Sequence, residues 1–85
     1  MKKENILEEM LDIYKIQLNR IKMELYYIKR IVEESILAHP EIYKRLKQIE
    51  NEISENLRDM LNQAVNPILS RQIKYLIHEY EKLLK

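Results

Sequence analysis

Large apolar residues recur at alternating intervals of four and three along the first part of the chain. The positions that keep this spacing are Leu7, Leu11, Tyr14, Leu18, Ile21, Leu25, Ile28 and Val32. Such a repeat is typical of an amphipathic helix that packs along the seam of a helical bundle. Nothing interrupts it before His39-Pro40, so the pattern predicts a helix over about residues 5–38, with Asn5 as its N-cap.

Two prolines divide the remainder of the chain. Proline removes a hydrogen bond from a helix interior but suits the first helical position. Pro40 therefore predicts a tight turn followed by a second helix over about residues 40–65. Asn66-Pro67 repeats this start signal and predicts a third helix over about residues 67–84. The alternative is one long helix that is kinked near the second proline.

Together these elements predict an all-α fold, in which an antiparallel helical hairpin is extended to a three-helix bundle. If the chain reverses near residue 39, position i of the first helix faces about position 79 minus i of the second. The basic stretch 13–30 would then face acidic residues of the second helix, namely Glu50, Glu52, Glu55 and Asp59. Complementary charges of this kind mainly select the register of the hairpin.

The first helix is expected to extend beyond its partners. The third helix is long enough to cover only residues 13–31 of the first, so residues 5–12 would protrude from the bundle. The apolar side chains at or next to this end are Ile6, Leu7, Met10, Leu11 and Tyr14. Burying one large apolar side chain is worth about 1.5–3 kcal/mol, and leaving several exposed favours aggregation. This excess predicts that another chain covers the protruding end.

A second apolar stripe supports the same conclusion. Met23, Tyr27 and Ile31, preceded by Ile16, lie on a different helix face from the main repeat. A helix with two apolar faces needs neighbours on two sides. In a monomeric three-helix bundle the other two helices would cover both faces. In a homodimer the second stripe or the free N-terminal end would meet a copy of itself, and this is the arrangement we favour.

Composition narrows the class of protein further. The chain has 85 residues, enough for a single domain with a modest core, and it contains neither glycine nor cysteine. Without glycine, tight β-hairpins and glycine-rich phosphate loops are excluded, and without cysteine so are disulfides and thiolate chemistry. The net charge of +1 identifies no partner. No apolar run suggests a membrane segment or a signal peptide, so we expect a cytoplasmic protein.

One charged feature is compatible with nucleic-acid binding. Lys15, Lys22 and Lys29 follow one another at intervals of seven, with Tyr26 between them and Arg30 beside the last. A basic stripe with an interleaved aromatic residue can follow a phosphate backbone. The simpler interpretation is an ordinary solvated helix face.

Residues that could carry catalysis are scarce. The two histidines, His39 and His78, begin no HExxH pair, and no glutamate lies three residues before either of them. The sequence therefore predicts no enzyme activity, no metal site and no cofactor.

The C-terminal segment Leu69-Ser70-Arg71-Gln72-Ile73-Lys74-Tyr75-Leu76-Ile77-His78-Glu79-Tyr80 resembles the small sporulation-regulator aspartyl-phosphate phosphatases. Their second helix carries Leu-Ser-Gln-Glu-Leu-Asp followed by Leu-Ile and Glu-Tyr. These family members are helical hairpins that dock on phosphorylated response regulators, so the resemblance implies binding to such a partner. The functional Asp of the family aligns with Lys74, and residues 65–68 replace a longer loop, which implies binding without phosphatase activity.

The sequence thus predicts a small, non-enzymatic adaptor or regulator that forms a homodimer and docks on a protein partner through apolar helix faces. The residues expected to form its interface are Ile6, Leu7, Met10, Leu11, Tyr14, Met23, Tyr27 and Ile31. Nucleic-acid binding through Lys15, Lys22, Lys29 and Arg30 is the alternative. A response-regulator-binding relative of the sporulation phosphatases is a further alternative.

Overall fold

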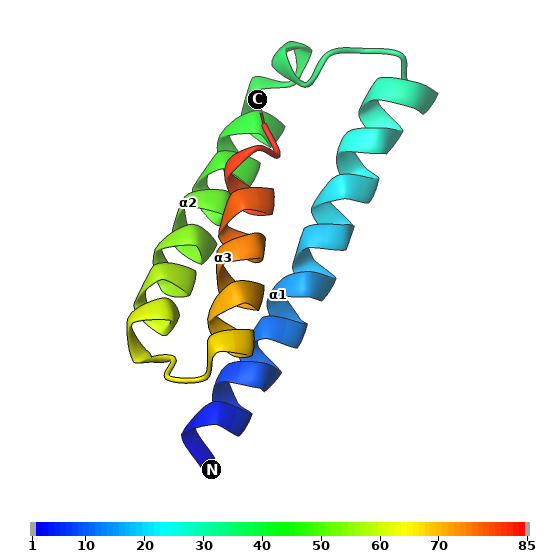
Figure 1. The fold of residues 1–85 in the computed structure, drawn as a ribbon. Helices are drawn as coiled ribbons and strands as arrows, with labels where there is room; N and C mark the ends of the chain where they lie inside the picture. The colour runs from blue at the N-terminus through cyan, green and yellow to red at the C-terminus, as the bar shows by residue number, and fades with distance from the viewer. Residues whose placement is uncertain (1, 85) are drawn as a thin grey trace.

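A computed structural model describes residues 2–84 of the protein, with side chains from Asn5 onward. Its elements are α1 (Lys2–Tyr26), the π-helical turn η1 (Tyr27–Ile31), the 3₁₀ turn η2 (Ile36–Ala38), α2 (Pro40–Gln63) and α3 (Pro67–Glu81). Figure 1 shows three helices that run side by side in up-down-up order, with α1 along one edge. The predicted all-α, antiparallel three-helix fold is confirmed.

The turn between α2 and α3 forms as the sequence predicts. Asn66 Oδ1 accepts hydrogen bonds from the backbone N–H groups of Ile68 (2.8 Å) and Leu69 (3.4 Å), and Pro67 is the first helical residue. The cap satisfies two of the donors that a helix start leaves free. Two separate helices therefore form, and the backbones of α2 and α3 approach each other more closely than α1 approaches either.

The predicted end of the first helix at residue 38 is wrong. Regular α-helix stops at Tyr26, and the π turn carries the chain to Ile31. Val32 N–H then donates to the carbonyl of Tyr27, and Glu34 N–H donates to the carbonyl of Ile28, both at 3.0 Å. Between these two donors lies Glu33, with φ at 59°. Glu33 thus adopts the left-handed conformation that glycine usually adopts at a helix end. For a residue with a Cβ atom this conformation costs about 1–2 kcal/mol of conformational free energy.

At this end of the bundle, Leu25 lines a common cavity with Leu83 and Leu84. The chain then crosses the end of the bundle, where Ile36 packs against the core. Ser35 Oγ accepts from Leu37 N–H at 3.2 Å and starts the 3₁₀ turn, a local bond that competes with a continuous helix.

The longer crossover changes the register of the hairpin. Asn56 Nδ2 donates to the Tyr14 hydroxyl at 3.2 Å, and Arg45 forms an ion pair with Glu24. A tight turn near residue 39 would have placed these α1 residues opposite positions 65 and 55 instead. Relative to the predicted pairing, α2 is displaced along α1 by nine or ten residues, roughly two and a half helical turns.

This displacement overturns the prediction that residues 5–12 protrude. Leu7 and Leu11 are only 4% and 1% exposed and belong to the core. Ile6, Leu7 and Met10 line a shallow pocket with Met60 near the C-terminal end of α2. The side of this segment that carries Leu7 and Leu11 is thus covered within the chain, whereas Ile6 remains 56% exposed.

The predicted charge pairing between the first two helices is wrong for the same reason. Among the described side chains, none of the four acidic residues expected to face α1 pairs with one of its bases. Glu50 pairs with Lys47 on its own helix at 3.3 Å, and Arg58 pairs with Glu81 of α3. The charges that join α1 to α2 have the opposite polarity, with the acid (Glu24) on α1.

The core follows the main apolar repeat of α1 and the matching faces of the other helices. It consists of Leu7, Leu11, Leu18, Ile21, Leu46, Ile53, Leu57, Met60, Leu69, Ile73, Leu76 and Tyr80. The Tyr80 hydroxyl donates to the backbone carbonyl of Tyr14, which ties α3 to α1. Burial raises the pKa of Tyr80 to about 12. Within residues 2–84, no helix has the length and apolar character required to cross a bilayer.

Candidate interaction surface

The outward face of α1 and η1 carries a row of large apolar side chains, which we call the outer stripe. Its members are Ile6, Ile13, Ile16, Met23, Tyr27 and Ile31, each at least 56% exposed. Their spacings of seven, three, seven, four and four keep them within one side of the helix, away from the core-facing repeat. α1 is therefore apolar on two faces, and the fold of one chain covers only one of them.

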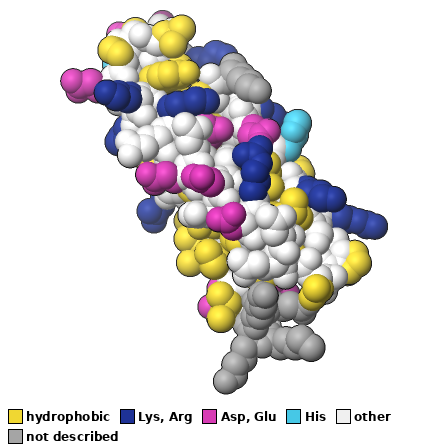
Figure 2. All heavy atoms as spheres, turned by 90° about the vertical axis from the view of Figure 1, so that its left-hand side faces the viewer, with side chains coloured by type: hydrophobic (Ala, Val, Ile, Leu, Met, Phe, Trp, Pro, Cys, Tyr) yellow, Lys and Arg dark blue, Asp and Glu magenta, His cyan; other side chains and the backbone are white. Residues whose placement is uncertain are grey.

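The surface of α2 is different. Figure 2 views the molecule from the side that α2 forms in Figure 1, and acidic and basic side chains are interspersed over it. After Pro40, every exposed position of α2 is polar or charged. Scattered single apolar residues on a surface are normal, whereas a large apolar patch is typical of surfaces that meet another molecule. The outer stripe places six large apolar side chains on one face of a single helix.

Part of the outer stripe is hollowed into a groove of about 740 Å³. Its lining residues are Asn19, Lys22, Met23, Tyr26, Tyr27 and Ile31. The first four occupy positions i, i+3, i+4 and i+7 of the helix, which is the arrangement of the holes that accept a side chain in coiled coils. The groove thus lies along the edge of the outer stripe, with Asn19 and Lys22 on its polar side.

The predicted interface residues divide into two groups. Ile6, Met23, Tyr27 and Ile31 lie on the outer stripe as large exposed side chains. The other four face the bundle: Leu7 and Leu11 are core residues, while Met10 and Tyr14 are half-buried beside it.

Two residues of this surface, Ile13 and Ile16, are not among the predicted interface residues. Ile13 belongs to neither of the predicted apolar faces, and Ile16 enters only as an extension of the second stripe. The signal is present, since Ile13 lies seven residues after Ile6 and three before Ile16. The core repeat runs through the same helix and is more regular, so it obscures the spacing of these exposed residues.

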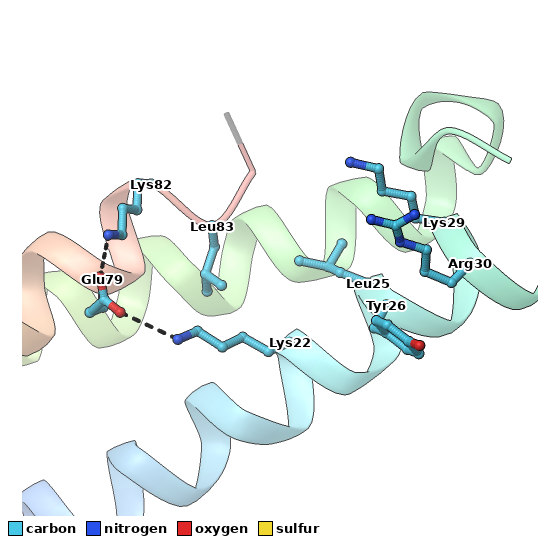
Figure 3. Close-up of a pocket in the computed structure, with 8 residues that line it drawn as sticks. All are labelled: Lys22, Leu25, Tyr26, Lys29, Arg30, Glu79, Lys82 and Leu83. Atoms are coloured by element: carbon cyan, nitrogen blue, oxygen red, sulfur yellow. Dashed lines mark hydrogen bonds and ion pairs between the residues drawn. The ribbon is translucent and has the colours of Figure 1, made fainter. Parts of the chain in front are cut away.

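A second feature lies beside the outer stripe, between α1, η1 and the end of α3. Figure 3 shows this groove of about 440 Å³, in which Leu25 of α1 and Leu83 line the apolar part. Its basic side chains are Lys22, Lys29, Arg30 and Lys82, and Tyr26 is at its edge. Three of the four residues predicted for nucleic-acid contact thus line one groove, and Lys82 joins them from the other end of the sequence. Lys15, the fourth, is exposed on α1 and does not line this groove.

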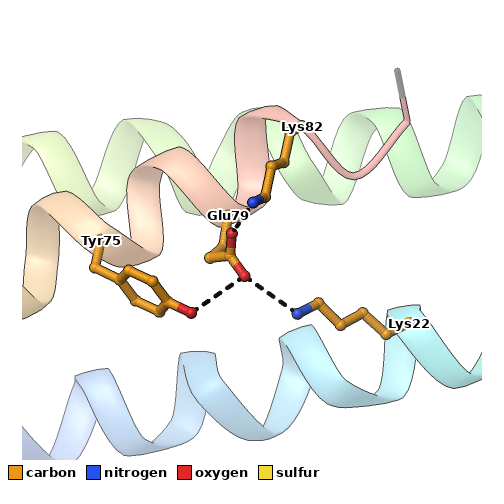
Figure 4. A network of polar contacts seen from close by, with 4 residues as sticks. All are labelled: Lys22, Tyr75, Glu79 and Lys82. Atoms are coloured by element: carbon orange, nitrogen blue, oxygen red, sulfur yellow. Dashed lines mark hydrogen bonds and ion pairs between the residues drawn. The ribbon is translucent and has the colours of Figure 1, made fainter.

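Glu79 partly neutralises these bases. Figure 4 shows its carboxylate between Lys82 Nζ, 2.6 Å from Oε2, and Lys22 Nζ, 3.3 Å from Oε1. The Tyr75 hydroxyl also donates to Oε1 at 3.4 Å. The hydrogen bond from Lys82 holds the pKa of Glu79 below its usual value against the opposing effect of desolvation, and it raises the pKa of Lys82. Among the described side chains, Lys29 and Arg30 form no ion pair, so the groove keeps a positive charge.

The two histidines lie in different parts of the fold. His39 Nε2 lies 2.8 Å from Glu34 Oε2 at the crossover, and His78 is exposed on α3. No three described His, Asp or Glu side chains lie close enough together to hold a metal ion. Lys74, which aligns with the functional Asp of the phosphatase family, is exposed beside Arg58 and Asn62 of α2. Of the positions that match this family, Leu69, Ile73, Leu76, Glu79 and Tyr80 are buried in the bundle.

Comparison with known proteins adds no relative. No family model matches the chain, and no curated protein or solved structure is similar to it. The exposed side chains of α1 are therefore the main guide to function.

Proposed function

We propose that the protein is a small, non-enzymatic helical interaction module that associates with itself through the outer stripe of α1. The observation that carries this proposal is the row of six large apolar side chains that the chain leaves exposed on a single helix face. A second copy is the partner we propose for it, because a stripe that runs along a whole helix is met over its full length by another copy of that helix.

The size of the surface supports this partner. With roughly 100 Å² exposed on each side chain, the six residues from two copies would together bury on the order of 1,200 Å². This is the lower end of the range of specific protein–protein interfaces. Burying one such side chain completely is worth about 1.5–3 kcal/mol, so the sum is large enough to offset a substantial part of the entropy lost on association.

A pair of glutamates on the stripe tests the proposal. Wild-type protein is expected to sediment as a dimer at micromolar concentration. Ile13→Glu combined with Met23→Glu should give a monomer with unchanged helical circular dichroism, because two carboxylates per copy would have to be desolvated in the interface. The dissociation constant should rise at least about a hundredfold, which corresponds to about 2.7 kcal/mol.

The matched control adds the same two charges to the polar face of α2. Gln48→Glu with Asn51→Glu changes two exposed residues and should leave the sedimentation profile of the wild type intact. A wild-type chain that sediments as a monomer at high micromolar concentration would refute the proposal. Equal dissociation by both double variants would show that net charge, rather than the outer stripe, governs association.

Nucleic-acid binding is a second candidate function, favoured by the basic groove beside Tyr26. Cations near an aromatic side chain suit a single strand, whose phosphates pair with the cations while its nucleobases stack on the ring. Lys29→Gln with Arg30→Gln should then weaken binding to a single-stranded oligonucleotide and lower the slope of log affinity against log salt by about 0.7 per lost phosphate contact. Lys44→Gln on the exposed face of α2 is the control. Absence of binding at low salt would exclude this function.

A further inference from the structure

The charges on the outer stripe also determine how two copies can lie against each other. Two sets of positions alternate along this face at intervals of four and three, as in the seam of a coiled coil. The first set is Ile6, Ile13, Arg20 and Tyr27, and the second set is Glu9, Ile16 and Met23. Two of these seven seam positions are charged, so the relative direction of the two helices decides which charges meet.

A parallel pair would bring each seam position against itself. Arg20 would meet Arg20 of the second copy, and Glu9 would meet Glu9 of the second copy. Like charges placed directly opposite one another in an interface are strongly unfavourable. The parallel arrangement is therefore opposed at two levels of the seam.

An antiparallel pair brings the first set against the second set. When all six residues of the outer stripe overlap, Ile13 faces Met23 of the second copy, and Arg20 faces Ile16 of the second copy. The arginine stem can lie along this isoleucine while its guanidinium reaches water. Glu9 faces the hydroxyl-bearing ring of Tyr27 of the second copy. No like charges meet at any of these levels.

The groove on the outer stripe lies at the corresponding height. Met23, the residue that faces Ile13 of the second copy, lines this groove. At this level an apolar side chain of each copy thus meets an apolar side chain of the other, as in the seam of a coiled coil. The two-fold axis of the pair passes close to residue 18 of both copies, so Asn19 of each copy lies next to the other. Their amide groups can donate and accept reciprocally.

We infer that two copies of this chain pair through antiparallel α1 helices, with Asn19 beside the two-fold axis. The inference rests on the proposed self-association and specifies its geometry. It also explains why a helix with charged residues on its seam is compatible with a stable interface. The core-facing side of α1 stays packed on α2 and α3, because the residues of the outer stripe are exposed in the single chain.

Cysteine cross-linking tests this geometry cleanly, because the chain contains no native cysteine. Asn19→Cys should form a disulfide with itself under mild oxidation and shift to twice 10.5 kDa on a non-reducing gel. Asp12→Cys and Tyr26→Cys lie seven residues to either side on the same edge of α1. Each should remain monomeric on the gel alone, whereas a mixture of the two should cross-link, since position 12 faces position 26 of the second copy.

Ile13→Cys separates the possible geometries. In a parallel pair it would cross-link with itself, and Asn19→Cys would not. This result overturns the inference while the proposed self-association stands. Cross-linking of Asp12→Cys with Asn19→Cys would indicate an antiparallel pair shifted by one heptad, and would overturn the alignment in which Asn19 lies at the axis. If no variant cross-links and each sediments as a monomer in the reduced state, the proposed function falls as well. Circular dichroism of each variant checks that the bundle remains folded.

Discussion

The helices α1 and α2 are almost equal in length, with 25 and 24 residues, but they expose different kinds of side chain to water. α2 is apolar on one face only, and its exposed positions after Pro40 are all polar or charged. α1 covers the core with one face and exposes the outer stripe on another. The apolar residues of α2 are thus used within the chain, whereas α1 has more than its own fold can bury. α1 therefore presents an apolar face to water that α2 does not have.

The largest effect is expected when a glutamate is placed on each face of α1 in turn, in two separate variants. Leu11→Glu would put a carboxylate at a core position that is 1% exposed. Burying an unpaired charge costs more than a small domain can usually lose, so the helical circular dichroism signal should collapse at 25 °C. Ile13→Glu, two residues later, should change the free energy of unfolding of the dilute monomer by no more than about 0.5 kcal/mol. Similar losses in urea titrations of both variants would contradict the assignment of the two faces.

A smaller loss of stability is expected when the hydrogen bond from Tyr80 to the Tyr14 carbonyl is removed on the core side of α1. Tyr80→Phe should lower the free energy of unfolding by about 0.5–1.5 kcal/mol, because the carbonyl loses its donor. Since the pKa of Tyr80 is raised to about 12 from 10.0, the folded state holds this proton more tightly than the unfolded state. The resulting stability is complete below pH 10 and is lost as the pH rises toward 12.

Alkaline urea titrations check this expectation. The wild type should lose stability more steeply than Tyr80→Phe between pH 10 and 12. Parallel pH profiles for the two proteins would show that the hydroxyl is not held as the structure indicates.

The ion-pair network of Glu79 lies at the edge between the two faces of α1, where it holds Lys22. The pKa of Glu79 is lowered from its usual value of 4.5 by the hydrogen bond from Lys82. The stability that this carboxylate contributes is therefore present above pH 4.5 and is lost as the pH falls through the lowered pKa. Glu79→Gln should unfold with a shallower dependence on pH below 4.5 than the wild type, as followed by thermal melts in acid. An identical acid dependence in both proteins would contradict a stabilising role for the network.

The smallest effect is expected at the end of the π turn. Glycine at position 33 would remove the steric cost of the left-handed conformation, although it would increase the entropy of the unfolded chain. Glu33→Gly should therefore raise the free energy of unfolding by about 0.5–1 kcal/mol in urea titrations. Glu33→Ala, which cannot relieve this cost, is the matched control. A destabilised Glu33→Gly variant would indicate that the glutamate makes a favourable contact.

Much of the fold follows from local signals in the sequence. The two prolines mark the starts of α2 and α3, since each occupies a position where a helix start tolerates the missing N–H group. Asn66 caps α3 because its side chain reaches the free donors of the first turn. The core repeat of α1 also predicted that positions such as Leu18 and Ile21 face the other helices. It was wrong at Val32, which follows the end of the helix and is 38% exposed.

The end of α1 could not be predicted from the same kind of signal. Residues 32–38 contain no glycine or proline, and a glutamate with positive φ has no distinctive local pattern. One early helix end then changed the register with α2 and moved Leu7 and Leu11 from the expected surface into the core. The error in the candidate interface thus arose from one misplaced boundary and not from a wrong choice of apolar residues.

The sequence by itself determined that the chain forms three helices and that the first has apolar residues on more than one face. Periodicity is a local property, and the side chains that set it lie within a few turns of each other. Only the tertiary structure decided which of these faces is covered. The alignment of α1 with α2 depends on where the crossover begins, and no local pattern in the sequence marks that position. Leu11 and Ile13 are two residues apart on one helix, yet packing against distant segments leaves one in the core and the other in water.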